Sequence, residues 1–506
     1  MSKTINRTEL LKRLSPTQRE LLLKELQKEA AQKNGEHKIT RRSEAGPIPL
    51  SFSQQRLWFL SQVNPNTPLY NVPEAVQLSG QLNVEALEQS LNEIIRRHDV
   101  LRTSFMVVAG QPVQICALSR RLYLKIVDLG QLAATAREAC AARLLKAEAR
   151  RRFDLTNDLL LRATLLRLDE ENHWALLTLH HIVADGWSMG LIVREVAALY
   201  EAYARGKESP LPELPIQYAD FAHWQRRWLR DEVLASQLDY WRKELAGAPT
   251  VLELPGDRPR PPVQTFHGAR FHFSFSVSLN ARLKEFSHNE GVTLFMSLLA
   301  GLSIVLSRYS GQTDILVGTT IANRNRAETE DLIGFFVNML VMRTDLSGTP
   351  SVRELLRQVR ERALEAYAHQ DLPFEKLVEE LQLDRDLSRA PLTQVVFTLQ
   401  NAPMDELRLE GLRMSMVEVE SGTAKFDVVV NIWEERGEMH GWIEYNRDIF
   451  DETRIQRMVQ HYENVMREML DHKDGMVEEI SMLSAEEDAM LKQQIEIEEL
   501  DVSFSF

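Results

Sequence analysis

His180-His-Ile-Val-Ala-Asp-Gly186 places two histidines, a carboxylate and a glycine within seven residues, directly after an apolar run. That run, residues 174–179, reads Trp-Ala-Leu-Leu-Thr-Leu and predicts a buried strand, which Gly186 brings to an end. Residues 188–203 carry apolar side chains at helical spacing. The histidine motif is therefore expected at a strand–loop–helix junction, a common place for side chains that line a functional site.

Strand geometry limits what two adjacent histidines do. Successive side chains of a strand point to opposite faces, so His180 and His181 do not both face one reacting atom if the strand continues through them. One histidine is then chemical and the other structural. An imidazole titrates near neutrality, which suits a general base or a group that orients a nucleophile. A histidine satisfied within the core is the alternative, and a metal site is disfavoured because no further ligand motif accompanies the pair.

The composition is that of a soluble protein with two domain-sized parts. At 506 residues, with 44% hydrophobic and 26% charged side chains, the chain is too long for one small core. The formal net charge of -13 argues against a nucleic-acid-binding protein. Cys116 and Cys140 provide no disulfide framework, and the sequence contains neither a membrane-spanning apolar stretch nor a secretory signal. These features predict a protein of the cytoplasm.

Four segments are expected along the chain. Residues 1–47 form a short helix, capped by Ser15, and a linker. Residues 48–225 form a first α/β lobe that carries the histidine motif. Residues 226–475 form a second lobe, and residues 476–506 form a tail that is either a docking segment or a disordered end.

The predicted elements of the two lobes are alike in kind, which indicates a duplicated α/β (α+β) architecture rather than a short-period repeat. The expected elements of the first lobe are a helix at 82–97, extended chain at 101–115 and a hairpin of strands 159–168 and 174–181. A proline-rich connection covers residues 245–264. The second lobe is expected to contain helices at 279–290, 294–309, 352–368 and 454–470, and strands at 315–320, 338–343, 394–399, 426–433 and 438–445.

Six further motifs accompany the histidine motif in the sequence. They are Ser51–Leu60, Arg97–Thr103, Tyr218–Trp224, Ile333–Arg343, His369–Glu375 and Arg385–Leu392. With the HHxxxDG-Trp-Ser sequence at His180–Ser188, they resemble, in order over about residues 48–470, a condensation domain of a non-ribosomal peptide synthetase. The chain departs from the family pattern at Asp99, where Glu is more usual, and at Met339, where Thr is common.

This resemblance implies both a fold and a reaction. The fold is two lobes similar to chloramphenicol acetyltransferase, set in a V as a pseudo-dimer with a central tunnel. The reaction is amide formation by an acyltransferase. The amine of an aminoacyl thioester on a downstream carrier protein attacks an acyl or peptidyl thioester on an upstream carrier. The carriers deliver their phosphopantetheine arms, so no bound cofactor and no metal are expected. Adjacent synthetase domains are expected as partners of a monomer that contacts neither nucleic acid nor membrane.

The resemblance also implies roles for single residues. His181 lies beside the attacking nitrogen, as a base or only as an orienting group, and His180 is a packing and hydrogen-bonding residue. Asp185 forms an ion pair with Arg102 that locks the loop. Gly186 lets the backbone approach the substrate, with its N–H as a possible oxyanion donor. The remaining residues expected along the tunnel are Trp187, Ser188 and Asn338.

Two other functions stay open at this point. One is a stand-alone acyltransferase that forms an ester or amide with a soluble acceptor. The other is a non-catalytic module that only recruits carrier proteins, against which the intact HHxxxDG motif speaks. The donor acyl group, the acceptor amino acid and the donor stereochemistry do not follow from the sequence.

Overall fold

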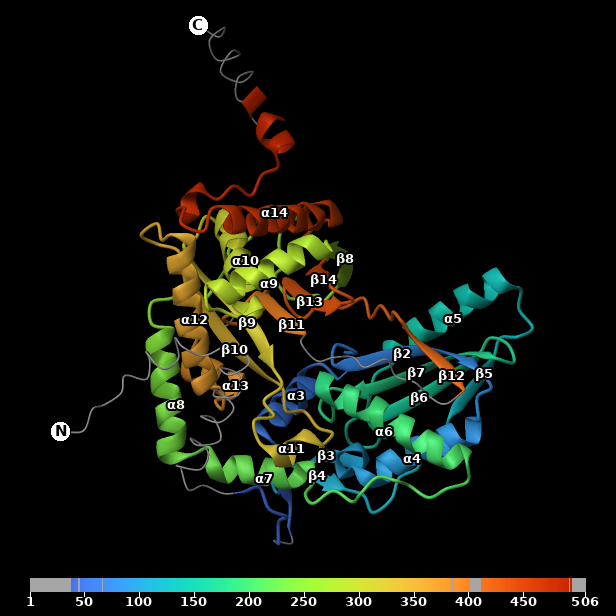
Figure 1. Cartoon of the computed structure of the whole chain (residues 1–506). Helices are drawn as coiled ribbons and strands as arrows, with labels where there is room; N and C mark the ends of the chain where they lie inside the picture. Colours follow the sequence, from blue (N-terminus) through green and yellow to red (C-terminus); the bar gives the residue numbers. More distant parts are fainter. Residues whose placement is uncertain are drawn as a thin grey trace, which may run out of the picture.

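Two α/β lobes make up the protein (Figure 1). The structure is a computed structural model that describes residues 38–43, 46–65, 67–383, 386–400, 411–490 and 492–493. The helix expected near Ser15 and residues 494–506 of the expected tail lie outside these ranges. The two-lobed, mixed α/β fold predicted from the sequence is confirmed.

The first lobe contains a five-stranded sheet, a three-stranded sheet and the helices that cover them. Its elements are β1 (Ile48–Pro49), α3 (Phe52–Val63), β2 (Asn71–Gly80), α4 (Val84–Arg97), η1 (Asp99–Arg102), β3 (Thr103–Val108), β4 (Gln111–Cys116), β5 (Lys125–Asp128), α5 (Ala134–Ala149), β6 (Leu161–Arg167), β7 (Asn172–His180), α6 (Gly186–Ala204) and α7 (Tyr218–Trp228).

The second lobe is built on a six-stranded sheet. The chain from α8 onward comprises α8 (Asp231–Glu244), β8 (Gly268–Phe275), α9 (Val277–Asn289), α10 (Leu294–Ser310), β9 (Asp314–Ile321), α11 (Ala327–Glu330), β10 (Asn338–Asp345), α12 (Val352–Ala368), α13 (Phe374–Glu380), β11 (Val395–Gln400), β12 (Leu412–Val417), β13 (Val428–Glu435), β14 (Glu438–Asn446), α14 (Glu452–Asp471) and η2 (Val477–Glu479).

Helices cover both faces of the five-stranded sheet of the first lobe. Alternate strand residues face opposite sides, so Leu165 of β6 is buried with α4 and α6, whereas Leu166 is buried with α5. Ala141 and Leu145 lie on the buried side of α5. Covering both faces fixes the position of β7, the strand that ends at the histidine motif.

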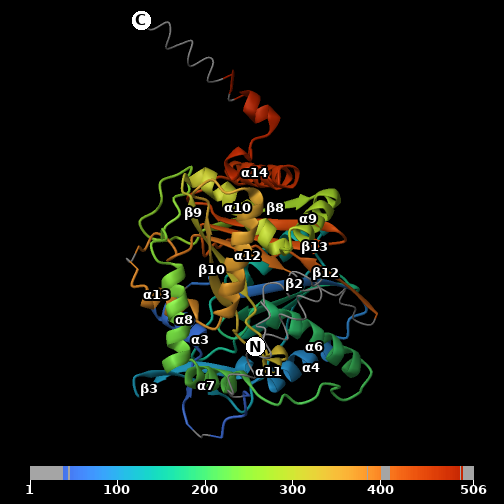
Figure 2. The same ribbon diagram turned by 60° about the vertical axis from the view of Figure 1, so that its left-hand side comes forward.

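The strand β12 departs from the sequence-based division at residues 225 and 226. It follows β11 of the second lobe, yet it pairs antiparallel with β2 and completes the sheet order β12-β2-β7-β6-β5 of the first lobe. Figures 1 and 2 both show β12 beside β2. Assigning all of residues 226–475 to the second lobe was therefore wrong for Leu412–Val417, because backbone pairing to a strand edge leaves no signal in the neighbouring sequence.

The second lobe packs its helices against the sheet of order β10-β9-β11-β13-β14-β8. The helix α10 is the most apolar of them, and Leu298–Leu306 is buried along its whole length. No single helix among the described residues is long and apolar enough to cross a membrane, and α9 and α10, which would suffice as a pair, meet at 105°. In both views α14 lies at one end of the molecule and α4 at the other (Figures 1 and 2).

Candidate active site

The histidine motif begins where β7 ends. His180 is the last strand residue, and its backbone N–H donates to the Leu160 carbonyl at 3.1 Å. The next N–H, that of His181, donates in the opposite direction to the Tyr70 carbonyl at 2.7 Å. Successive residues therefore face opposite neighbours, as strand geometry requires. The two imidazoles lie in different surroundings.

His180 is buried in the first lobe. Its Nδ1 accepts the Ile182 N–H at 3.1 Å, which places the proton of the neutral ring on Nε2. The ring packs 6.0 Å from the ring of Phe153 and 6.4 Å from that of Tyr70, centroid to centroid. Burial lowers the pKa of His180 to about 3, with the cations around it adding to the effect. A neutral, hydrogen-bonded ring in an aromatic pocket is suited to a structural role.

His181 has the opposite hydrogen-bonding pattern, in which Nδ1 donates instead of accepting. Its Nδ1 lies 2.8 Å from the Ala184 carbonyl, which only accepts, so Nδ1 carries the proton and Nε2 has a free lone pair. Burial, followed by the nearby Lys425, lowers the pKa of His181 to about 4, and Asp185 opposes that shift. The ring of Phe335, from the second lobe, lies 4.7 Å away. The motif thus presents one oriented, uncharged base.

Asp185 is fully engaged in hydrogen bonds. Oδ1 accepts the Ser188 N–H at 2.9 Å, which caps the N-terminus of α6. Oδ2 accepts the N–H groups of Phe336 and Val337 at 2.9 and 3.2 Å, which ties this loop to the second lobe. Oδ1 also pairs with Arg324 Nη2 at 3.2 Å, and both side chains are at most 2% exposed. Asp185 has no spare oxygen for proton transfer and acts as a structural clamp.

The predicted partner of Asp185 was wrong: it is Arg324, not Arg102. Arg102 pairs with Asp99, three residues away in η1. Its other N–H groups donate to the carbonyls of Arg96 and Ala117, at 3.1 and 2.6 Å. Arg102 lies in η1, just after α4, and its guanidinium satisfies the Ile95 and Arg96 carbonyls that the end of the helix leaves without partners. Arg324 follows β9 and meets the first lobe at the N-terminus of α6, where it contacts Asp185 and Ser188.

The residues after Asp185 join the lobes. Ser188 is fully buried, its Oγ accepts the Gly334 N–H at 3.0 Å, and it therefore lines no tunnel. Trp187 is 43% exposed and donates its indole N–H to the Glu330 carbonyl of α11 at 3.0 Å. Gly186 opens α6, and nothing lies within 4 Å of where a Cβ would be. Its N–H is among those that a helix leaves without partners at its N-terminus.

Comparison with known proteins identifies the family. A model of the condensation domain matches residues 44–492. The chain belongs to the condensation domain family. It is 47% identical over 476 residues to one of the linear gramicidin synthase proteins of Brevibacillus parabrevis, an alignment that covers 94% of this chain and 9% of that protein.

Solved structures are similar over most of the chain. The X-domain from teicoplanin biosynthesis superposes with a TM-score of 0.81 at 29% identity, covering 88% of this chain and 100% of that one. The SgcC5 protein from Streptomyces globisporus, solved with a naphthyl ethanediol and sucrose, has a TM-score of 0.71 at 29% identity, covering 85% and 100%. These likenesses extend across both lobes of this condensation domain.

Four of the accompanying motifs meet around the histidine motif and the Asp185 clamp. The Tyr218 hydroxyl, in the motif Tyr218–Trp224, lies 2.9 Å from Ser51 Oγ and donates to the Phe335 carbonyl of the motif Ile333–Arg343 at 2.7 Å. In the second motif, His98 Nε2 lies 2.9 Å from Glu195 of α6. These contacts hold the histidine loop between two lobes.

We expect Gly334→Ala to destabilise this condensation domain. A Cβ at position 334 would lie 2.0 Å from Cδ2 of Tyr218, whose hydroxyl is already held by two partners. Overpacking of this kind costs about 1–3 kcal/mol of the free energy of unfolding. Gly190→Ala in α6 is the matched control, because nothing lies within 4 Å of its Cβ position. Urea denaturation showing equal stability for both variants would contradict this packing account.

Asn338 was predicted to reach the tunnel, and in the structure its side chain is hydrogen-bonded to the backbone before and at the start of α13. Its side-chain amide donates to the carbonyls of Gln370 and Leu372 at 2.9 and 2.7 Å, and its Oδ1 accepts the Phe374 N–H at 3.0 Å. All three partners are backbone groups of the motif His369–Glu375. Asn338 thus holds the turn before α13, and its place along the tunnel stays a prediction.

Sequence reasoning missed Arg324, Tyr70 and Lys425. Arg324 follows the strand β9, a position at which a charge often serves a site, but nothing nearby in sequence distinguishes it from Arg326. Tyr70 and Lys425 are brought beside the histidines by the pairing of β2 with β7 and of β12 with β2. Among the described residues, no group of three or more potential ligands is placed to hold a metal ion.

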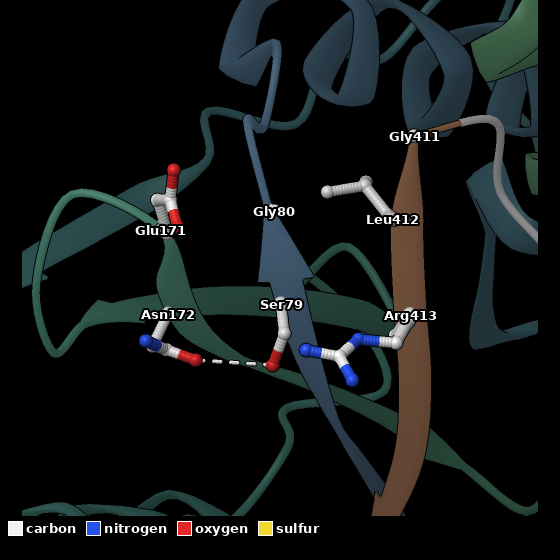
Figure 3. Close-up of a pocket in the computed structure, with 7 residues that line it drawn as sticks. All are labelled: Ser79, Gly80, Glu171, Asn172, Gly411, Leu412 and Arg413. Atoms are coloured by element: carbon white, nitrogen blue, oxygen red, sulfur yellow. Dashed lines mark hydrogen bonds between the residues drawn. The ribbon is translucent and has the colours of Figure 1, made fainter.

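A shallow hollow at the opposite end of β2 is a poor candidate for the site. It is lined by Ser79, Gly80, Glu171, Asn172, Gly411, Leu412 and Arg413 (Figure 3). Asn71 of β2 pairs with His180, whereas Ser79 pairs with Asn172, so about eight strand residues, roughly 25 Å, separate the hollow from the motif. The Ser79 hydroxyl already donates to Asn172 Oδ1 at 3.0 Å, as Figure 3 shows.

Proposed function

We propose that this condensation domain is an acyltransferase that forms an amide bond between two carrier-bound thioesters. The observation that supports it most is the uncharged His181 imidazole, with Nδ1 bound to the Ala184 carbonyl and Nε2 left to meet an amine. The 47% identity to a linear gramicidin synthase protein supports peptide formation over other acyl transfers.

The chemistry needs little from the protein beyond alignment. The acceptor amine attacks the donor thioester carbonyl, a C–N bond forms, and the C–S bond breaks. The amine proton passes to the departing thiolate, directly or by way of His181 Nε2. Because a thioester is already activated, holding the two reactants in the tunnel provides much of the rate.

The negative charge that develops on the carbonyl oxygen of the donor thioester needs a hydrogen-bond donor beside it. Gly186 is the first residue of α6, so its N–H points away from the helix body at the positive end of the helix dipole. A developing oxyanion beside it is stabilised without reorganisation. The exposed backbone at Gly186 leaves room for the thioester there.

The proposed partners are an upstream donor carrier and a downstream acceptor carrier, each with a phosphopantetheine arm, in the context of neighbouring synthetase domains. This chain spans only 9% of the length of the gramicidin synthase protein, so that context is itself part of the proposal. A monomer that binds no nucleic acid and works in the cytoplasm is the expected form.

A second candidate is transfer to a soluble alcohol or amine. The observation that favours it is the likeness to SgcC5, whose structure contains a small diol. The same imidazole would serve a hydroxyl acceptor, so the acceptor decides between the two functions.

Competition between acceptors tests the proposal. The domain is mixed with an acyl-loaded donor carrier, an aminoacyl-loaded carrier and an excess of soluble amino acid amide and 1,2-diol. Intact-mass measurement should find the donor acyl group joined to the aminoacyl carrier. Acylation of only the soluble amine or diol would overturn the carrier-bound function and support the second candidate.

A further inference from the structure

Lys425 lies in the segment between β12 and β13, and its side chain reaches across to the first lobe. Its Nζ is 5.0 Å from the centroid of the Tyr70 ring. The Tyr70 carbonyl accepts the His181 N–H at 2.7 Å, and its ring lies 6.4 Å from the His180 ring. Tyr70 thus contacts both the ammonium and the histidine motif.

The backbone around Lys425 is fixed on both sides. The Ala424 N–H donates to the Phe266 carbonyl at 3.0 Å, and the Gly268 N–H donates to the Gly422 carbonyl at 3.0 Å. Two residues further on, buried Asp427 is paired with Arg260. The ammonium is therefore held near the histidine motif by the fold of the second lobe.

Two carboxylates in the surroundings of Lys425 and Tyr70 are already paired with arginines. Glu444 pairs with Arg270 at 3.2 Å, and Glu375 pairs with Arg56 at 2.9 Å. Within the part of the chain that the structure describes, no carboxylate lies within 4.0 Å of the Lys425 ammonium. Desolvating a cation without a close counterion is costly, so such a lysine is a candidate for a functional role.

The charge nevertheless persists near neutrality. Burial lowers the pKa of Lys425 to about 8, Glu444 opposes this shift, and Arg56 adds to it. A group with that pKa is mostly protonated at neutral pH. After burial, its charge is the next cause that lowers the pKa of His181, where the Asp185 carboxylate and backbone hydrogen bonds oppose it, and it also lowers the pKa of His180 together with Arg162.

We propose that Lys425 is a positioning residue whose positive charge favours the uncharged form of the amine bound beside His181 and adds to the effect of burial on the His181 imidazole. The part that concerns the amine rests on the proposed function. A protonated amine cannot attack a carbonyl, and a nearby cation favours the neutral, nucleophilic form. An imidazolium formed beside Lys425 would also be more acidic, and it would pass its proton readily to the departing thiolate.

An NMR titration of the histidine rings in the full chain tests this. We expect Lys425→Met, and equally Lys425→Gln, to raise the pKa of His181 by about one unit, because a like charge nearby has been removed. Lys425→Arg retains the charge and should leave the His181 titration as in the wild type. Lys376→Met, which removes a lysine paired with Glu379 on α13, is the matched control and should also leave it unchanged.

The pH dependence of the single-turnover rate between loaded carriers should change in the same variants as the His181 titration. Its acid limb should move to higher pH in Lys425→Met and return in Lys425→Arg. An unchanged His181 titration in folded Lys425→Met and Lys425→Gln would overturn the proposal. The two proposals can fail separately. If the His181 titration shifts in the variants but the domain forms no amide with any carrier pair, the effect of Lys425 on His181 is supported and the proposed function is contradicted.

Discussion

His181→Ala is expected to reduce the rate of amide formation between two loaded carriers by about 10²–10⁴-fold, the usual contribution of a positioned acid–base group. The substitution removes the only ring nitrogen of the motif that has a free lone pair, because His180 Nδ1 accepts the Ile182 N–H. A quench-flow measurement of single turnover under saturating carriers reads this loss directly.

The fold should survive this substitution. The His181 side chain makes one hydrogen bond, to the Ala184 carbonyl, so its loss costs about 1 kcal/mol. His472→Ala is a matched control, because that ring lies at the end of α14 with 60% of its side chain exposed. Wild-type turnover in His181→Ala would contradict the assignment of the working imidazole.

Asp185→Ala is expected to destabilise the protein by about 3–5 kcal/mol, the cost of breaking a buried ion pair from one side. Arg324 would be left buried and charged, and the N–H groups of Ser188, Phe336 and Val337 would lose their acceptor. Thermal and urea denaturation should both show the loss. The turnover rate of the folded fraction should fall less than that of His181→Ala.

An exposed ion pair provides the comparison for this prediction. Arg96→Gln removes the partner of Glu93 and Glu213 on the surface, and we expect a change below about 1 kcal/mol. Adding Arg324→Met to Asp185→Ala should cost less than the sum of the two single changes, because the two side chains interact. A stable but inactive Asp185→Ala protein would instead indicate that Asp185 takes part in the chemistry.

Periodic segments were predicted well from the sequence. Residues 352–368 were expected to be a helix and form α12, which Ser351 caps through the Glu354 N–H. The hairpin predicted around residues 169–172 is β6 and β7, paired antiparallel. Such elements depend on local capping and on burial of one face, and both leave a pattern in neighbouring residues.

The errors concern contacts between distant segments. Arg102 and Asp99 are three residues apart in η1, so local geometry alone favours their pairing over one between Arg102 and Asp185. Choosing Arg324 for Asp185 requires knowing that the end of β9 meets the start of α6, a contact over 139 residues of sequence. The position of the Lys425 ammonium beside the histidine motif cannot be predicted from the sequence either, because it depends on the pairing of β12 with β2.

A time course of intact masses for the domain and both carriers tests the central claim most directly. With an acyl-loaded donor and an aminoacyl-loaded acceptor, the acyl mass should leave the donor carrier and appear on the acceptor carrier, added to the aminoacyl group. The domain itself should gain no mass at any time, because His181 serves the amine rather than carrying the acyl group. An acyl group that accumulates on the domain, or that is released without reaching the acceptor carrier, would contradict this account.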